Sequence, residues 1–242
     1  MNLITSKTNP KIKEAYAYLL SPSDYFLFEG YHLLEMALLS NSLVRTFSLA
    51  PLKDLPSNVE QYIVTEDIIK KLSSSKSPEG VVGVAKRKEA LPLSSSRVLI
   101  LESISDPGNM GTLLRGALSF GFLDVILLGE SVSPVNPKAI ASSQGAIFSL
   151  NIVKSLDTRT TLLSIKKDGY LLLGTDLKSS LPLGSYKDKK IDKLALILGN
   201  EARGVSPLAL SIAEENVRIE MSRIDSLNVA MAGSILMYQF RG

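Results

Sequence analysis

The chain has 242 residues, 45% of them hydrophobic and 21% charged, which is the composition of a globular protein of one large or two small domains. No apolar run approaches the roughly 18 residues that cross a bilayer, and the first residues lack the apolar stretch of a signal peptide. Since there is no cysteine, disulfides, thiolate nucleophiles and cysteine metal sites are excluded. We expect a cytoplasmic protein that does not bind membranes.

The charge balance is nearly even, with 27 Lys and Arg against 24 Asp and Glu and a net charge of +3. Binding to phosphate would therefore depend on local basic clusters. Clusters of this size are more often ordinary solvated surface. Three are candidates for nucleic-acid contact: Lys7 with Lys11 and Lys13; Lys86, Arg87 and Lys88; and Lys187, Lys189, Lys190 and Lys193.

The first third of the chain indicates a small α/β unit, in which short apolar runs alternate with segments of helical periodicity. We expect helices over residues 10–20, 31–39 and 66–72, and strands over 25–30, 44–49, 61–64 and 81–85. The only histidine, His32, lies early in the second helix beside Glu29 and Glu35. We favour a surface histidine over a general base, because no second catalytic partner is near.

The basic triplet at 86–88 is followed by Leu-Pro-Leu and three serines, a composition typical of a linker. Beyond it, strands and helices alternate again, which predicts a mainly parallel sheet. We expect strands over residues 98–101, 125–128, 170–174, 194–198 and 217–219, and helices over 110–120, 138–143, 158–167 and 230–240. The predicted domains are residues 1–90 and 97–242, with a linker over 91–96.

Polar loops follow the last two predicted strands. The first, Gly199 to Val205, contains an amide, a carboxylate and a guanidinium between two glycines. The second begins at Glu220 and extends to Val229, before the final helix. An open α/β sheet binds its ligands beyond the carboxyl ends of its strands. We therefore expect the two loops to form one shared pocket.

Several common site motifs are absent from the sequence. No G-x-G-x-x-G follows the first strand of either unit, and there is no phosphate-binding G-x-x-x-x-G-K-[ST] and no G-x-S-x-G. With one histidine and no cysteine, a zinc site is not expected either.

A third polar segment follows the strand at 98–101. Asp106-Pro107-Gly108 has the composition of a turn, and Asn109 is a candidate cap for the next helix. Arg115 then lies about two turns into that helix among apolar residues. Such an arginine either has an anionic partner or substrate, or extends along the helix flank to reach solvent. The segment alone leaves the two interpretations even.

Taken together, three segments resemble a known family. N-x-G-x-x-x-R at 109–115, G-N-E-x-x-G at 199–204 and S-L-N-V at 226–229, in this order, resemble the three motifs of the SpoU (TrmH-type) RNA ribose methyltransferases of the SPOUT superfamily. Intermediate stretches agree, namely Asn136-Pro137-Lys138 with Gly145-Ala146, and Gly174-Thr175-Asp176. More loosely, Phe28-Glu29-Gly30 resembles the small ribosomal-protein-like RNA-binding domain that precedes the catalytic domain in many members.

The resemblance implies an α/β fold whose carboxyl-terminal parallel-sheet domain contains a deep trefoil knot, and a homodimer formed through that domain. It implies S-adenosyl-L-methionine as cofactor and RNA as partner, with ribosomal RNA favoured over tRNA and no DNA. The polar catalytic group would be Asn109, Arg115, Glu201, Ser226 and Asn228. The cofactor-binding residues would be Gly174, Thr175, Leu198, Gly199, Asn200, Gly204, Ile219, Met221 and Leu227.

Accounts of the family treat the arginine as a base, but deprotonating a guanidinium is very unfavourable, so we favour an electrostatic and phosphate-positioning role for Arg115. The sequence departs from the family at Glu220, where proline is usual, and at Ala141, where arginine is common. Neither departure removes a member of the polar group. The alternatives are a tRNA methyltransferase and a non-catalytic RNA-binding or ribosome-assembly factor.

Overall fold

The structure is a computed structural model that describes residues 2–21, 23–177, 180–223 and 226–242. Its contacts divide the chain into two compact units. The first contains residues 1–89 together with 135–148, and the second contains 90–134 and 149–242. A short segment from the middle of the chain thus belongs to the first unit. Within the described residues, no helix is long and apolar enough to cross a membrane.

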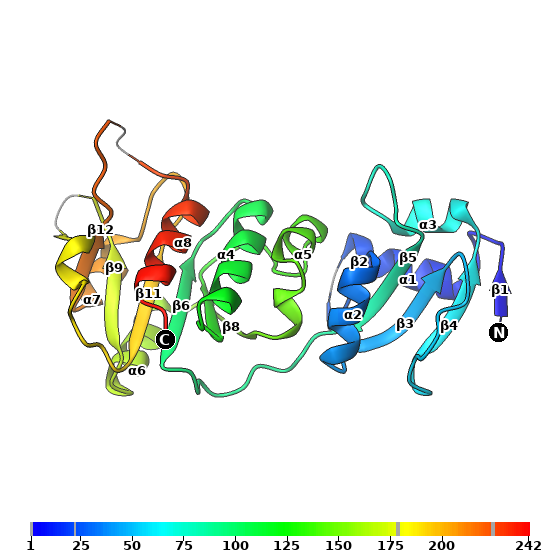
Figure 1. The fold of residues 1–242 in the computed structure, drawn as a ribbon, viewed down its shortest axis with the longest axis horizontal. Helices are drawn as coiled ribbons and strands as arrows, with labels where there is room; N and C mark the ends of the chain where they lie inside the picture. The colour runs from blue at the N-terminus through cyan, green and yellow to red at the C-terminus, as the bar shows by residue number, and fades with distance from the viewer. Residues whose placement is uncertain (1, 22, 178–179, 224–225) are drawn as a thin grey trace. The chain divides into compact units, whose positions relative to one another are not determined.

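The first unit has a five-stranded sheet in the order β1-β4-β3-β5-β2, in which β5 is antiparallel to both neighbours (Figure 1). Every helix and strand expected here is present. Strand β1 was not expected, because three residues are too few to show a period. The elements are β1 (Asn2–Ile4), α1 (Pro10–Leu20), β2 (Tyr25–Glu29), α2 (Tyr31–Leu39), β3 (Leu43–Ser48), β4 (Glu60–Val64), α3 (Glu66–Leu72), β5 (Val81–Lys86), α5 (Pro137–Ser143) and η1 (Ala146–Phe148).

Both faces of this sheet are covered. Helices α1 and α3 contribute Ile12 and Ile68 to a buried cluster with Leu27 of β2. Because side chains alternate along a strand, the neighbours of Leu27 point to the other face. There the rings of Phe26 and Phe28 lie 5.9 and 5.4 Å from that of Phe148, so residues 135–148 complete the core on that side.

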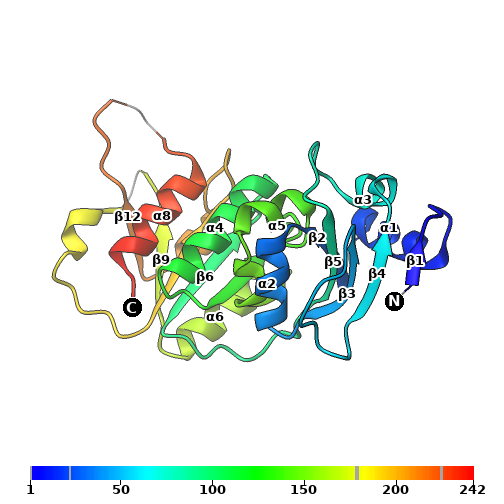
Figure 2. The same ribbon diagram turned by 45° about the vertical axis from the view of Figure 1, so that its right-hand side comes forward.

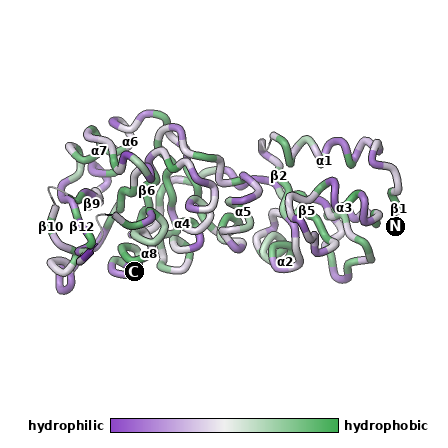
Figure 3. The backbone as a smooth tube through the Cα atoms, turned by 90° about the horizontal axis from the view of Figure 1, so that it is seen from above, coloured by the Kyte–Doolittle hydropathy of each residue, from purple (hydrophilic) through white to green (hydrophobic). Residues whose placement is uncertain are grey.

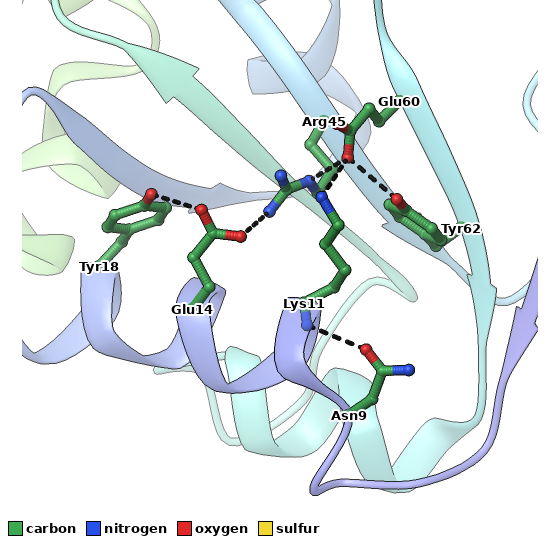
Figure 4. Close-up of polar contacts among 7 residues, drawn as sticks. All are labelled: Asn9, Lys11, Glu14, Tyr18, Arg45, Glu60 and Tyr62. Atoms are coloured by element: carbon green, nitrogen blue, oxygen red, sulfur yellow. Dashed lines mark hydrogen bonds and ion pairs between the residues drawn. The ribbon is translucent and has the colours of Figure 1, made fainter.

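An almost buried arginine joins α1, β3 and β4 (Figure 4). The side chain of Arg45 is 8% exposed and donates to Glu14 and Glu60, at 2.8 Å in each case. Tyr18 and Tyr62 donate to the same two carboxylates. Burial raises the pKa of Glu14 and of Glu60, but the hydrogen bonds from Arg45 and the tyrosines outweigh it and leave both pKa values below the ordinary 4.5.

The second unit has a seven-stranded sheet in the order β10-β12-β9-β11-β6-β7-β8 (Figure 2). Within the described residues, its neighbouring strands pair in parallel. Helices α4 and α8 pack together on one face, and α6 and α7 pack together on the other. The elements are β6 (Arg97–Glu102), α4 (Pro107–Ser119), β7 (Asp124–Leu128), β8 (Asn151–Ser155), α6 (Thr158–Lys167), β9 (Leu171–Thr175), β10 (Leu181–Pro182), η2 (Leu183–Tyr186), β11 (Leu194–Leu198), α7 (Pro207–Ile212), β12 (Glu215–Arg218) and α8 (Val229–Gln239).

Helix α8 is hydrophobic along most of its length and approaches α4 closely (Figure 3). A Cβ added at Gly233 would lie 2.5 Å from Leu113 Cδ2, and one at Gly116 would lie 2.7 Å from Met237 Cε. The expected strands and helices of this unit are present, whereas β8, β10, α7 and η2 were not expected. One local prediction was wrong: α4 begins at Pro107 and its cap is Asp106, whose carboxylate accepts from the N–H of Asn109.

The segment expected to be a linker is hydrogen-bonded to the second unit. Both side-chain groups of Asn151 bond to the backbone of Leu91. The carboxylate of Asp124, which is 1% exposed, accepts from the N–H groups of Ser94 and Ser95 and from Asn151. These bonds lie where β7 and β8 begin, at the amino edge of the sheet.

The Arg45 contacts give a pH-dependent prediction. Arg45→Met should lower the free energy of unfolding by about 2 kcal/mol near neutral pH, less than for a fully buried pair because both carboxylates are 43% exposed. The two pKa values are depressed in the folded state, so this stabilisation exists above pH 4.5 and is lost as the pH falls through the folded pKa values. Urea unfolding at several pH values should therefore show a shrinking difference between wild type and variant. Lys70→Met, at an exposed ion pair with Glu66, is the control and should change little; a deficit for Arg45→Met that does not vary with pH would contradict the prediction.

Candidate active site

A cavity of about 340 Å³ lies at the carboxyl edge of the parallel sheet. Its walls come from the ends of β9, β11 and β12, from the loops that follow them, and from the first turns of α8. It is lined by Thr175, Asp176, Leu177, Leu198, Gly199, Asn200, Glu201, Ala202, Arg203, Gly204, Val205, Leu210, Val217, Arg218, Ile219, Met221, Ser226, Leu227, Val229, Ala232 and Leu236. The two polar loops predicted to share a pocket both contribute to it.

The loop after β11 folds back on itself. The backbones of Asn200 and Gly204 exchange hydrogen bonds of 3.0 and 2.8 Å, and the Asn200 side chain accepts from the N–H of Ala202 and of Arg203. A Cβ at Gly199 would lie 2.1 Å from the backbone of Gly204, so only glycine fits. Gly204 has a φ of +69°. The two glycines thus allow the tight turn that forms this wall.

All but one of the cofactor-binding residues predicted by resemblance line the cavity. Those that do are Thr175, Leu198, Gly199, Asn200, Gly204, Ile219, Met221 and Leu227. Gly174 is the exception. A Cβ there would lie 2.3 Å from Asn216 Oδ1, so this glycine allows β9 and β12 to pack closely. Glu220, one of the two departures from the family pattern, is exposed and does not line the cavity.

Three members of the predicted polar group form one hydrogen-bonded set beside the cavity. The carboxylate of Glu201 accepts from Asn109 Nδ2 at 3.1 Å. Asn109 Oδ1 accepts from Asn228 Nδ2 at 3.0 Å. Asn228 in turn caps α8 by accepting from the N–H groups of Ala230 and Met231. Residues from α4, the loop after β11 and the start of α8 are therefore joined through two amide side chains.

Glu201 is held in its ionised form. Its oxygens also accept from the N–H and hydroxyl of Ser105 and from the N–H of Asp106, at 2.8 to 3.1 Å. Burial raises the pKa of Glu201, but the hydrogen bonds from Asp106, Asn109 and Ser105 outweigh it and lower the pKa to about 2. At neutral pH the group is a carboxylate whose oxygens are engaged by donors.

The other two members of the polar group lie apart from this set. Ser226 is exposed and lines the cavity. Arg115 is exposed on α4, six residues beyond Asn109, and within the described chain no hydrogen bond or ion pair of its guanidinium is found. Among the residues that the structure describes, Arg115 has no anionic partner, and it is not hydrogen-bonded to Glu201.

Sequence reasoning missed part of the cavity wall. Arg203 lies in the predicted glycine loop, so its position between the two glycines was an available signal. Arg218 is the last residue of β12 and donates to the carbonyl of Ser180. The apolar wall from α8 carried no signal in the sequence, since Val229, Ala232 and Leu236 have the pattern of any buried helix. Among the described residues, no group of three or more His, Cys, Asp and Glu could hold a metal ion.

An all-parallel α/β sheet with a ligand-sized cavity at its carboxyl edge defines a class of ligand-binding α/β proteins. Within that class, a model described as the SpoU rRNA Methylase family matches residues 96–238, and the chain belongs to this family. One relative, the 23S rRNA (guanosine(2553)-2'-O)-methyltransferase RlmP of Bacillus subtilis (strain 168), is 31% identical over 223 residues, which cover 90% of this chain and 88% of that protein.

Solved structures are similar over nearly the whole chain. An AdoMet-bound rRNA methyltransferase from Sinorhizobium meliloti superposes with a TM-score of 0.86 at 25% identity, covering 98% of this chain and 96% of that one. The crystal structure of an RNA 2'-O ribose methyltransferase superposes with a TM-score of 0.78 at 28% identity, covering 98% of this chain and 97% of that one. The similarity therefore extends beyond the residues that the family model matches.

The Glu201 contacts predict how this carboxyl titrates. In a carbon-13 NMR titration, Glu201 should stay ionised well below its ordinary pKa of 4.5, because hydrogen bonds from Asp106, Asn109 and Ser105 stabilise the charged form. Asn109→Ala removes one donor and should move the pKa back toward 4.5. The depressed pKa stabilises the fold above pH 4.5, and that contribution is lost as the pH falls toward about 2. An ordinary titration of Glu201 in the wild type, or no change in Asn109→Ala, would refute this account.

Proposed function

We propose that this protein transfers a methyl group from S-adenosyl-L-methionine to a ribose 2'-oxygen of ribosomal RNA. One observation carries the proposal: in a chain of the SpoU rRNA methylase family, the cavity that fits a cofactor adjoins the hydrogen-bonded set of Asn109, Glu201 and Asn228. At that point the apolar side chains of the cavity, the backbone of the loop from Gly199 to Val205 and the polar set lie next to one another. Such a combination can hold a donor and a polar acceptor side by side.

The cavity suits S-adenosylmethionine. Its volume of about 340 Å³ is within the range of small-ligand pockets. Leu198, Ile219 and Leu227 would enclose the apolar part of the cofactor, and the tightly folded loop from Gly199 to Val205 would form the facing wall. When bound, S-adenosylmethionine supplies an electrophilic methyl group on a sulfonium. The chain's part is to fix the direction of attack and to exclude water.

The polar set would orient the substrate. Because its pKa is about 2, Glu201 is a poor proton acceptor at neutral pH, and we assign it to positioning the turn at Ser105 and the amide of Asn109. Asn109 and Asn228 support each other in fixed orientations. Ser226, which lines the cavity, completes the polar side. In this role the set holds the ribose in line with the methyl donor.

Arg115 would act on the charge of the RNA. A ribose 2'-hydroxyl loses its proton as it attacks, and a nearby cation stabilises the negative charge that develops on the oxygen. An exposed guanidinium without an ion pair in the described structure is available for that charge or for an adjacent phosphate. Its five donors in a rigid plane match a phosphate better than an ammonium does.

Residues 1–90 would be the RNA-binding domain and 97–242 the methyltransferase domain. Of the three basic clusters in the sequence, Lys86, Arg87 and Lys88 are all exposed. Lys7 and Lys11 are paired with carboxylates, as is Lys189. We therefore favour the triplet at 86–88 as an RNA contact. Ribosomal RNA is our preferred substrate over tRNA because the first unit resembles a ribosomal-protein-like RNA-binding domain, and the cytoplasm is the proposed location.

Two further parts of the proposal concern architecture. A homodimer is supported by three exposed apolar residues at helical spacing on α8, Met231, Ile235 and Tyr238. Light scattering that finds only monomer at micromolar concentration would rule it out.

A trefoil knot is supported by the path of the chain, in which β11 lies between β9 and β6 and α8 returns to pack on α4. An experimental density map of residues 194–242 tests the knot.

Cofactor binding and RNA methylation test the central proposal. S-adenosylmethionine or its demethylated product should bind and raise the melting temperature, because it stabilises only the folded state, whereas ATP and NAD should not. Mapping 2'-O-methyl groups in total RNA from cells with and without the gene should then reveal a lost site in ribosomal RNA. A lost site in tRNA would support the tRNA alternative, and cofactor binding without any lost site would support a non-catalytic factor.

The role of Arg115 can be separated from packing. Arg115→Ala should bind cofactor as wild type does but transfer methyl about 100- to 1000-fold more slowly, because it removes a cation from a developing negative charge. Arg115→Lys should also be slow, since a point charge on a flexible stem does not reproduce a planar donor. The measurement is single-turnover methylation with saturating RNA and cofactor, beside thermal melts.

Arg159→Ala, at an exposed arginine of α6, is the matched control and should methylate at the wild-type rate. If Arg115→Ala methylates within a few-fold of wild type, Arg115 has no part in the reaction. If its activity falls only in proportion to the folded fraction, the arginine is structural.

A further inference from the structure

The last residue of β6, Glu102, is a buried carboxylate that the proposed mechanism does not use. It is 7% exposed. Its two oxygens accept from one residue, Ser206: Oε2 from the N–H at 2.8 Å and Oε1 from the hydroxyl at 2.7 Å. A buried carboxylate is costly unless donors satisfy it, so this pairing fixes the two residues to each other.

Ser206 stands at the far end of the loop that walls the cavity. The loop runs from Gly199 to Val205, and Ser206 caps α7 directly after it by accepting from the N–H of Ala209. The near end is fixed as well, because Asn200 Nδ2 donates to the carbonyl of Ser103 at 2.9 Å. Both ends of the loop are therefore tied to consecutive residues, 102 and 103, at the end of β6.

The loop needs such ties because it is tightly folded. Gly204 and Val205 approach Gly199 so closely that a Cβ there would lie 2.1 Å from their backbone atoms. All three residues line the cavity. Without an anchor at Ser206, the outer half of the loop could move away from Gly199 and the wall would lose its shape.

We propose that Glu102 is a positioning residue that holds this wall in the shape that binds the cofactor. It acts through Ser206 and does not itself line the cavity. The inference rests on the proposed function for the identity of the ligand. It predicts that loss of Glu102 weakens cofactor binding and leaves the rate at saturating cofactor unchanged. Glu201, near the start of the loop, keeps its own hydrogen bonds to Ser105, Asp106 and Asn109, and Arg115 lies outside the loop on α4.

The chain offers a matched control in Asp124, at the opposite edge of the same sheet. Asp124 is also a buried carboxylate that accepts from backbone N–H groups, but it does so at the start of β7. Asp124→Asn and Glu102→Gln should both lower the melting temperature. Only Glu102→Gln should alter the cavity.

Calorimetry with S-adenosylmethionine and with its demethylated product is the first measurement. We expect the Kd of Glu102→Gln to rise about tenfold and that of Asp124→Asn to stay at the wild-type value. In steady-state methylation, the KM for cofactor should rise in parallel with little change in kcat. Ser206→Ala keeps the carboxylate and the backbone N–H that donates to it, but loses both hydrogen bonds of the hydroxyl, the one to Glu102 and the cap bond from the N–H of Ala209. Because the backbone bond to Glu102 remains, this variant should raise the Kd less than Glu102→Gln. It also serves as the test if Glu102→Gln does not fold.

The second measurement needs no cofactor. Arg203 is exposed at the tip of the loop and is a cleavage site for trypsin. In full-length protein, cleavage after Arg203, followed by mass spectrometry, should be faster in Glu102→Gln than in wild type or Asp124→Asn, because cleavage requires local opening. Added cofactor should slow it.

Equal Kd values for Glu102→Gln, Asp124→Asn and wild type would overturn the inference, as would equal cleavage at Arg203. A loss of kcat with unchanged KM would also overturn it, since that would make Glu102 part of the reaction. A wild-type chain that binds no cofactor contradicts the proposed function, and in that case the cleavage rates still decide whether Glu102 anchors the loop.

Discussion

The candidate site depends on the hydrogen bonds that join the turn after β6 to the loop after β11, between residues 92 to 104 positions apart in the chain. The two segments satisfy each other. The turn accepts through Glu102 and the carbonyl of Ser103, and it donates to the carboxylate of Glu201. Because these polar groups bond to one another across the two segments, two loops that would each be mobile alone form one wall.

The hydrophobic core and the site share the same two helices. Gly116 of α4 and Gly233 of α8 admit side chains of the facing helix or sheet that a Cβ would exclude. This close packing aligns the first turn of α4 with the first turn of α8, so that Asn109 and Asn228 meet. Helix α4 also carries Arg115 on its exposed side. The geometry of the polar set is thus a consequence of apolar packing below it.

The first unit is held together differently. A charged residue, Arg45, ties α1 to β3 and β4 and is satisfied by two carboxylates. An aromatic residue from the middle of the chain, Phe148, fills the face of the sheet that α1 and α3 do not cover. The domain that we propose for RNA binding therefore takes part of its core from residues that the family model assigns to the methylase.

The sequence by itself determined most helices and strands, the parallel sheet and the residues of both polar loops, because strand burial, helical period and turn composition are local properties. It did not predict β8, whose side chains are mostly half-buried, or the cap of α4, which is Asp106 and not the expected Asn109. Only the tertiary structure decided which polar residues meet. Glu201 is hydrogen-bonded to Asn109, and Glu102 is paired with Ser206. In the described structure Arg115 is hydrogen-bonded to neither Glu201 nor Asn109. Such contacts depend on how closely separate strands and helices pack, which no local sequence pattern encodes.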